Sequence, residues 1–131
     1  MDALLARLES ANEGSRELDV AIEIATQRCD PTGYLLGDEL HWNEPHEFGS
    51  TVAYEPLCQP LPHYTTSLDA ALTLVPEGKE WGVDFYSEKK VYFEAAIGKP
   101  GSLENEVVVE APTPALALCI AALKARAVNH N

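Results

Sequence analysis

The chain has 131 residues, the size of a single domain, and its 46% hydrophobic and 23% charged residues are typical of a globular protein with one core. Twenty-one acidic against nine basic residues give a net charge of −12. Such a field repels phosphate backbones and anionic lipids, so binding to a nucleic-acid polymer or a membrane surface is disfavoured.

Two helices are expected first, over residues 2–9 and 16–27, because leucine, isoleucine and alanine recur there at helical spacing. Residues 29–62 hold eight prolines or glycines, which divide the segment into pieces too short for a helix. We therefore predict a long surface loop over 29–62, with only a brief strand at 50–55.

A third helix is predicted from Thr66, as the capping residue, to the stop at Pro76 and Gly78. Three strands in succession, at 81–86, 91–97 and 106–110, then indicate an antiparallel meander.

The last helix is expected to begin at Pro114, with Thr113 as its N-cap. This order of elements predicts an α+β fold, with helices covering an antiparallel sheet of three or four strands. The chain divides into N-terminal helices at 1–28, a loop at 29–62 and the remaining elements at 63–131, all within one domain.

The acidity is unevenly distributed. Residues 1–62 hold 12 acids and 3 bases, whereas residues 63–131 hold 9 acids and 6 bases. The simplest interpretation is that the charge maintains solubility. A surface that imitates nucleic acid is the sharper alternative, although the acids alternate with apolar residues and form no runs.

Three cysteines, Cys29, Cys58 and Cys119, form no CxxC pair and are odd in number, which indicates neither a disulfide framework nor a zinc motif. The N-terminal MDALLARLES lacks the basic and apolar regions of a signal peptide, and no apolar run reaches the length of a membrane span. We expect a cytoplasmic protein with reduced thiols.

Three stretches carry a family resemblance: LLARLESANEGSRELDVAIEIA near the N-terminus, TTSLDAALTLVPEG followed by Trp81, and TPALALCIAALKARA near the C-terminus. Together they resemble the phage ABA sandwich domain family of small phage and prophage proteins of unknown molecular function. The resemblance implies an α/β/α-type sandwich and a phage or prophage origin. It brings no catalytic residue, and the segment 29–62 has no counterpart in it.

One segment has metal-like composition: His41, Glu44, His46 and Glu47 lie close together in HWNEPHE. The HExxH geometry is excluded because Pro45 interrupts any helix there. A solvated loop with Trp42 against the core is the simpler interpretation, so no metal site is expected.

Catalytic patterns are weak. Asp69 and Asp84 could pair for acid–base work, but they are more simply a helix N-terminal acid and an exposed strand residue. Ser67 near His63 lacks a nucleophile elbow and is better placed to cap a helix. No P-loop or GxGxxG occurs. We expect no enzyme, no catalytic residue and no cofactor.

The candidate ligand site combines aromatic and cationic side chains around the hairpin predicted at 81–97. Its aromatic rings could stack on a base while its lysines neutralise a phosphate. Core packing is the competing interpretation for Trp81. The residues assigned to this site are Lys79, Trp81, Tyr86, Lys89, Lys90 and Tyr92.

The expected function is therefore binding, and two classes stay open. One is the sequestration of a small nucleotide-like ligand in counter-defence. The alternative is an acidic interaction module that inhibits or modulates a host or phage protein through the N-terminal half. A hydrolase with an undetected acid pair is a weaker third hypothesis, and an apolar helix face could also continue into a homo-oligomer.

Overall fold

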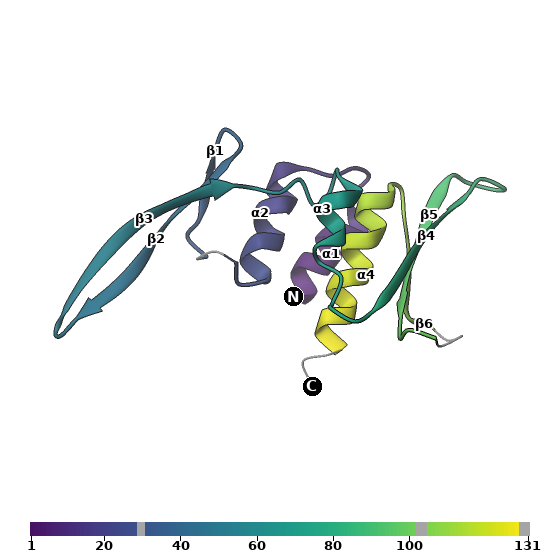
Figure 1. Cartoon of the computed structure of the whole chain (residues 1–131). Helices are drawn as coiled ribbons and strands as arrows, with labels where there is room; N and C mark the ends of the chain where they lie inside the picture. The colour runs from purple at the N-terminus through teal and green to yellow at the C-terminus, as the bar shows by residue number, and fades with distance from the viewer. Residues whose placement is uncertain (29–30, 102–104, 129–131) are drawn as a thin grey trace.

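The computed structural model describes residues 1–28, 31–101 and 105–128. The helices gather in the middle of the molecule, with one antiparallel sheet on each side (Figure 1). The α+β class is confirmed. The described elements are α1 (Asp2–Ser10), α2 (Arg16–Ala25), β1 (Tyr34–Leu36), β2 (Glu39–Phe48), β3 (Thr51–Pro60), α3 (Leu68–Leu72), β4 (Glu80–Tyr86), β5 (Tyr92–Gly98), β6 (Asn105–Ala111) and α4 (Pro114–Val128).

Helix α4 is the centre of the core. Every residue from Ala115 to Leu123 is buried, which is the pattern of a helix covered on all sides. It packs against β5 and β6 and also contacts α1 and α3. Thr113 Oγ1 accepts a hydrogen bond from the backbone N–H of Leu116, at 3.2 Å, so the predicted N-cap is confirmed.

The sheet β4–β5–β6 is the predicted antiparallel meander. Side chains alternate across it, as the strand period requires. Ala95, Ile97, Val107 and Val109 are buried in the core that α4 dominates. The opposite face carries acidic side chains, which are described with the candidate site below.

The prediction of a long loop over 29–62 is wrong. β1, β2 and β3 form a second antiparallel sheet there, joined by two-residue loops at Gly37–Asp38 and Gly49–Ser50. Both glycines have a positive φ, of +62° and +64°, as tight hairpin turns demand at their first central position. We call the long hairpin β2–β3 the arm.

The prolines of the arm are compatible with strands because of their register. Counting from the Gly49–Ser50 turn, Pro45, Pro56 and Pro60 fall at positions whose N–H would point away from the paired strand. A missing N–H at an outer edge breaks no hydrogen bond between the strands. The base of the arm is anchored by Leu40 and Trp42, which are buried as the interpretation of Trp42 predicted.

Helix α3 is shorter than predicted. It covers five residues, and its N-cap is Ser67, whose hydroxyl accepts from the N–H of Ala70, in place of the predicted Thr66. The hydroxyl of Thr73 bonds back to the carbonyl of Ala70, at 2.6 Å, at the end of the helix. Leu74 beyond that end remains fully buried.

Asp19 of α2 is fully buried and ties α2 to the chain segment that precedes α3. Its Oδ1 accepts from the backbone N–H of Thr65 at 2.8 Å and from the Thr65 hydroxyl at 2.7 Å. Its Oδ2 accepts from Nη1 of Arg16 at 2.9 Å. Both carboxylate oxygens are satisfied, as a buried charge requires.

Glu23, one turn further along α2, is buried in the same way. The hydroxyl of Tyr64 donates to its Oε1 at 2.5 Å, and Nε2 of Gln59 donates to its Oε2 at 3.0 Å. Arg28 in turn donates to the Tyr64 hydroxyl at 2.8 Å. Since Gln59 belongs to β3, this network joins α2 to the base of the arm.

The first prediction concerns Gly14, which lies against the network. A Cβ at Gly14 would collide with the backbone carbonyl of Thr65. We expect Gly14→Ala to lower the free energy of unfolding by about 1–3 kcal/mol, measured by urea denaturation. Gly82→Ala is the matched control, because a Cβ there meets no atom within 4 Å. Equal stability of the two variants would contradict this packing.

The second prediction concerns Tyr64. Burial, followed by the hydrogen bond to Glu23, raises its pKa from 10.0 to about 12. Between these values the unfolded chain has lost the phenolic proton and the folded chain retains it, so stability falls as the pH rises from 10 to about 12. In Tyr64→Phe, the free energy of unfolding, measured with urea, should fall less between pH 10 and about 12 than in the wild type. The same dependence on pH in both proteins would refute the assignment of the raised pKa to Tyr64.

Candidate functional site

Four of the six predicted ligand residues lie together at the end of the β4–β5 hairpin. Tyr86, Lys89, Lys90 and Tyr92, with Glu88, line an open cavity of about 460 Å³. The rings of Tyr86 and Tyr92 are parallel within 10°, with their centroids 5.1 Å apart. This spacing leaves no room for a base between the rings, so a ligand would stack on one outer ring face.

Lys79 and Trp81 do not belong to this cavity. Nζ of Lys79 pairs with Oε1 of Glu106 at 2.8 Å, and its side chain is only 14% exposed, so it ties the start of β4 to β6. Trp81 lies opposite Ile97, at the far end of the hairpin from Tyr86. Trp81 is 43% exposed and only partly used in packing.

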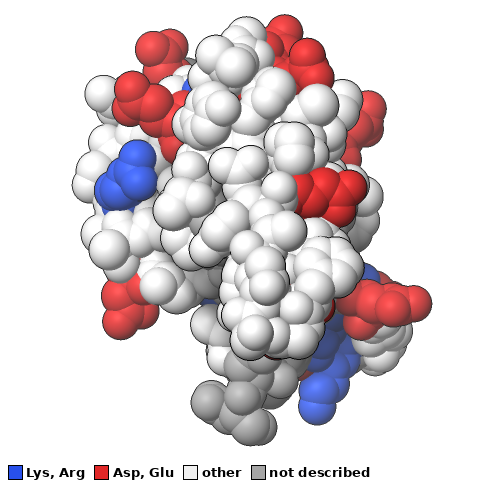
Figure 2. Space-filling model, turned by 90° about the vertical axis from the view of Figure 1, so that its left-hand side faces the viewer, with Lys and Arg blue, Asp and Glu red and all other residues white. Residues whose placement is uncertain are grey.

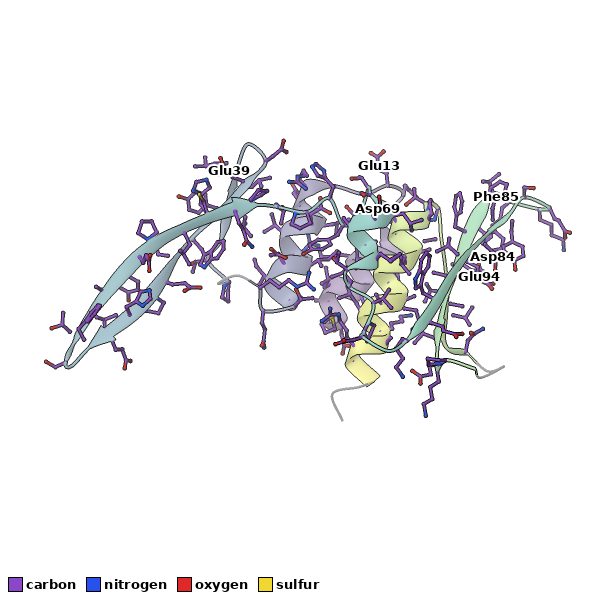
Figure 3. The ribbon with its side chains drawn as sticks, viewed as in Figure 1. Glu13, Glu39, Asp69, Asp84, Phe85 and Glu94 are labelled. Atoms are coloured by element: carbon purple, nitrogen blue, oxygen red, sulfur yellow. The ribbon has the colours of Figure 1, made fainter. Side chains whose placement is uncertain are left out.

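The charge around the cavity is mostly negative. Asp84, Glu94 and Glu110 are cross-strand neighbours in the register and form a row of carboxylates across the sheet. Figure 3 shows Asp84 and Glu94 side by side. The negative charge of Glu94 is the main cause of a raised pKa at Tyr86. Burial, followed by Glu110, raises the pKa of Tyr92.

The lysines do not outweigh these acids. Nζ of Lys90 lies 3.6 Å from the carboxylate of Glu110 and 5.2 Å from the ring centroid of Tyr92. Within the described part of the chain, Lys89 makes no ion pair, which leaves one uncommitted cation at the cavity. The cavity therefore offers two stacked aromatic rings but only one uncommitted cation, in a mostly negative surrounding.

The arm is the second candidate surface. All residues from 43 to 56 are exposed, on both faces of the hairpin. They include Phe48, Val52 and Tyr54, which are 67%, 49% and 68% exposed. By the register, Val52 and Tyr54 share one face of the hairpin and Phe48 lies on the other, so both faces expose large apolar side chains, which can mark an interaction surface.

The arm is also acidic. It carries Glu39, Glu44, Glu47 and Glu55, and the sequence has no lysine or arginine between Arg28 and Lys79. Figure 2 views the molecule from the side of the arm and shows uncharged surface bordered by acidic groups, with few basic ones. Such a surface favours a partner with positive charge.

The edges of the arm disfavour addition of a further strand. Pro45 and Pro56 lack the N–H group that an added strand would pair with at these edge positions. The side chains on the two faces of the hairpin remain accessible, whereas the edges are poorly suited to pairing with a further strand.

Two other combinations of residues considered from the sequence are the histidines of HWNEPHE and the pair Asp69 and Asp84. His41 and His46 lie on opposite faces of β2, because they are an odd number of residues apart, so the two histidines of HWNEPHE do not face one another. His46 pairs with Glu55 at 2.8 Å. Asp69 on α3 and Asp84 on β4 lie apart in Figure 3, and no acid pair forms between them.

The sequence interpretation missed the arm as a surface. The available signal was the pair of Gly-X dipeptides at 37–38 and 49–50, each flanked by strand-forming residues, which is a hairpin pattern. The prolines were interpreted as breakers because the edge positions at which they are tolerated depend on a register that the sequence alone does not reveal.

Comparisons with known proteins give no match: no family model matches the sequence, and neither curated protein sequences nor solved structures show a significant similarity. The resemblance to the phage ABA sandwich domain family therefore stays a prediction. No helix in the described ranges is long and apolar enough to cross a membrane.

Proposed function

We propose that the protein is a non-enzymatic interaction module whose arm docks into a groove on a partner protein with a basic surface. The single observation that carries this proposal is the exposure of residues 43–56 on both faces, with Phe48, Val52 and Tyr54 among them. A two-stranded hairpin with neither face covered is marginally stable in water. Covering it by a partner would stabilise both the arm and the complex.

In this proposal the aromatic and the acidic side chains of the arm have different roles in binding. Tyr54 and Phe48 are large side chains that supply binding energy once they are buried in a pocket. Glu47 and Glu55 would steer the approach of a basic partner and set its orientation. Charge of this kind raises the association rate more than the final affinity.

The acids of the N-terminal half, residues 1–62, fall into two groups. Asp19 and Glu23 of α2 are buried and hydrogen bonded within the fold, whereas the acids of the arm, in the same half, are exposed. Neutralising Asp19 and Glu23 would damage the core and not a docking surface. The acids available to a partner include those of the arm.

The third prediction tests the arm. Tyr54→Ala should weaken binding to a purified partner by at least about 30-fold, the effect of losing a central aromatic contact. The partner is first isolated with the wild-type chain as bait and then titrated against each variant. Tyr86→Ala, at the other sheet, is the matched control and should bind as the wild type does. Equal affinities for wild type and Tyr54→Ala would refute the proposal.

A second candidate function is the sequestration of a small nucleotide-like ligand at the β4–β5 hairpin. It is favoured by the cavity that brings Tyr86 and Tyr92 together with Lys89 and Lys90. The neighbouring row of carboxylates weighs against a multiply charged phosphate. A ligand with one aromatic ring system and few phosphates would fit best.

The fourth prediction tests this cavity. A nucleoside monophosphate that binds should raise the melting temperature of the protein, and the stabilisation should grow with the logarithm of the ligand concentration once that concentration exceeds Kd. Tyr86→Ala and Lys89→Ala should remove that shift, whereas Lys99→Ala, an exposed lysine outside the cavity, should retain it. No shift across a panel of nucleotides at millimolar concentration would eliminate this candidate.

The biological setting is part of the proposal. The resemblance to the phage ABA sandwich domain family supports a phage or prophage accessory protein that acts in the cytoplasm of a bacterial host, in counter-defence. Cys58 and Cys119 are free thiols, which agrees with a reducing compartment.

A further inference from the structure

Three different metal-ligand types meet at the base of the arm. Glu39 and His41 of β2 and Cys58 of β3 each offer one donor atom, and these three atoms all lie within 4.8 Å of one another. Figure 3 shows Glu39 close to β1, where the arm joins the rest of the sheet. The cluster lies well away from the Tyr86–Tyr92 cavity.

The register explains why these residues converge. Glu39 and His41 are two residues apart in one strand and therefore share a face. His41 is directly opposite Cys58, at a pair that makes no hydrogen bond across the strands, where Cα atoms approach to about 4.5 Å. The core residues Leu40 and Trp42 point to the opposite face; Glu39 and Cys58 are exposed, and His41 is half-buried.

The imidazole of His41 is also oriented by a neighbour. The ring of Tyr34, its cross-strand partner on β1, stacks on it with centroids 5.8 Å apart and an interplanar angle of 21°. The stack limits rotation of the imidazole. Packing that fixes the orientation of a ligating histidine is a common feature of metal sites.

The donor set selects a class of metal. A thiolate, an imidazole and a carboxylate are the three ligand types of protein zinc sites, and sites with three protein ligands keep one position open. Tetrahedral zinc with bonds of about 2.0–2.3 Å holds its ligand atoms about 3.3–3.8 Å apart. Donors within 4.8 Å of one another need to move together by roughly 1 Å, which side-chain rotation supplies.

We propose that Glu39, His41 and Cys58 form a binding site for one divalent transition-metal ion, with zinc as the preferred ion and water in the fourth position. The carboxylate and the thiolate together supply two negative charges, which the divalent ion balances. The sequence has no lysine or arginine from residue 29 to residue 78, and the nearby guanidinium of Arg16 pairs with Asp19 and Asp38.

In the free protein, the thiol and the carboxylate satisfy each other. A hydrogen bond to Glu39 is the first cause of a raised pKa at Cys58, followed by burial and by the negative charge of the same carboxylate. Metal binding would replace the shared proton, which leaves to solvent. The ion would then join β2 to β3 by side-chain bonds at the point where the arm leaves the body.

The fifth prediction tests the site with Co²⁺ and Zn²⁺ on the full chain, with thiols reduced. Co²⁺ should bind with a stoichiometry of one and show both a thiolate charge-transfer band and the strong visible absorption of tetrahedral coordination. Isothermal titration should show competition by Zn²⁺ at the same site. Cys58→Ser should lose the charge-transfer band, and His41→Ala should weaken Zn²⁺ binding by at least about 10-fold.

His46→Ala is the matched control, since His46 lies on the same strand but on its other face and pairs with Glu55. It should bind Zn²⁺ with unchanged affinity. Circular dichroism establishes that each variant is folded, and Glu39→Gln provides a further test that keeps side-chain size and should also weaken binding. A thiolate charge-transfer band that survives in Cys58→Ser would overturn the proposal. An equal loss of Zn²⁺ affinity in His41→Ala and His46→Ala would also overturn it.

Discussion

The buried carboxylates of α2 are the interaction on which the rest of the structure depends. Asp19 holds the backbone and hydroxyl of Thr65, and Glu23 holds Tyr64 and Gln59. A buried carboxylate is strongly destabilising unless each oxygen finds a donor, so these contacts must form together. They fix the segment that connects the arm to α3. The carbonyl of Tyr64 also accepts from the thiol of Cys119, at 3.0 Å, which brings the same segment against α4.

Buried and exposed acidic residues contribute equally to the net charge, although they have different roles in the structure. Asp19 and Glu23 serve the fold, whereas Glu47 and Glu55 on the arm are exposed and Glu94 on the β4–β5–β6 sheet is half-exposed. A net charge of −12 therefore says little about where a partner would be attracted. The two sheets that carry the candidate surfaces extend from the central helices in opposite directions, as Figure 1 shows.

Much of the second half could be predicted from the sequence because its signals are local. Thr113 before Pro114 begins α4, and the alternation around Val83 and Phe85 gives a strand that pairs with β5. The arm could not be predicted in this way, because Pro45 and Pro56 are tolerated only at particular register positions. Only part of the candidate cavity could be predicted from the sequence. Tyr86 and Tyr92 come together because they are close along one hairpin, whereas Lys79 pairs with Glu106 of β6, a contact that the local sequence does not indicate.

The sequence by itself determined the α+β class, the meander and the N-cap of α4, because capping, turn chemistry and side-chain alternation act over a few residues. Only the tertiary structure decided which acids are buried, that residues 39–60 form an arm, and that Cys58 lies beside His41 and Glu39. These outcomes depend on the pairing register and on contacts across 36 to 46 residues of chain, such as Tyr64 with Glu23 and Thr65 with Asp19. Such contacts form only when separate elements pack, and no local pattern specifies them.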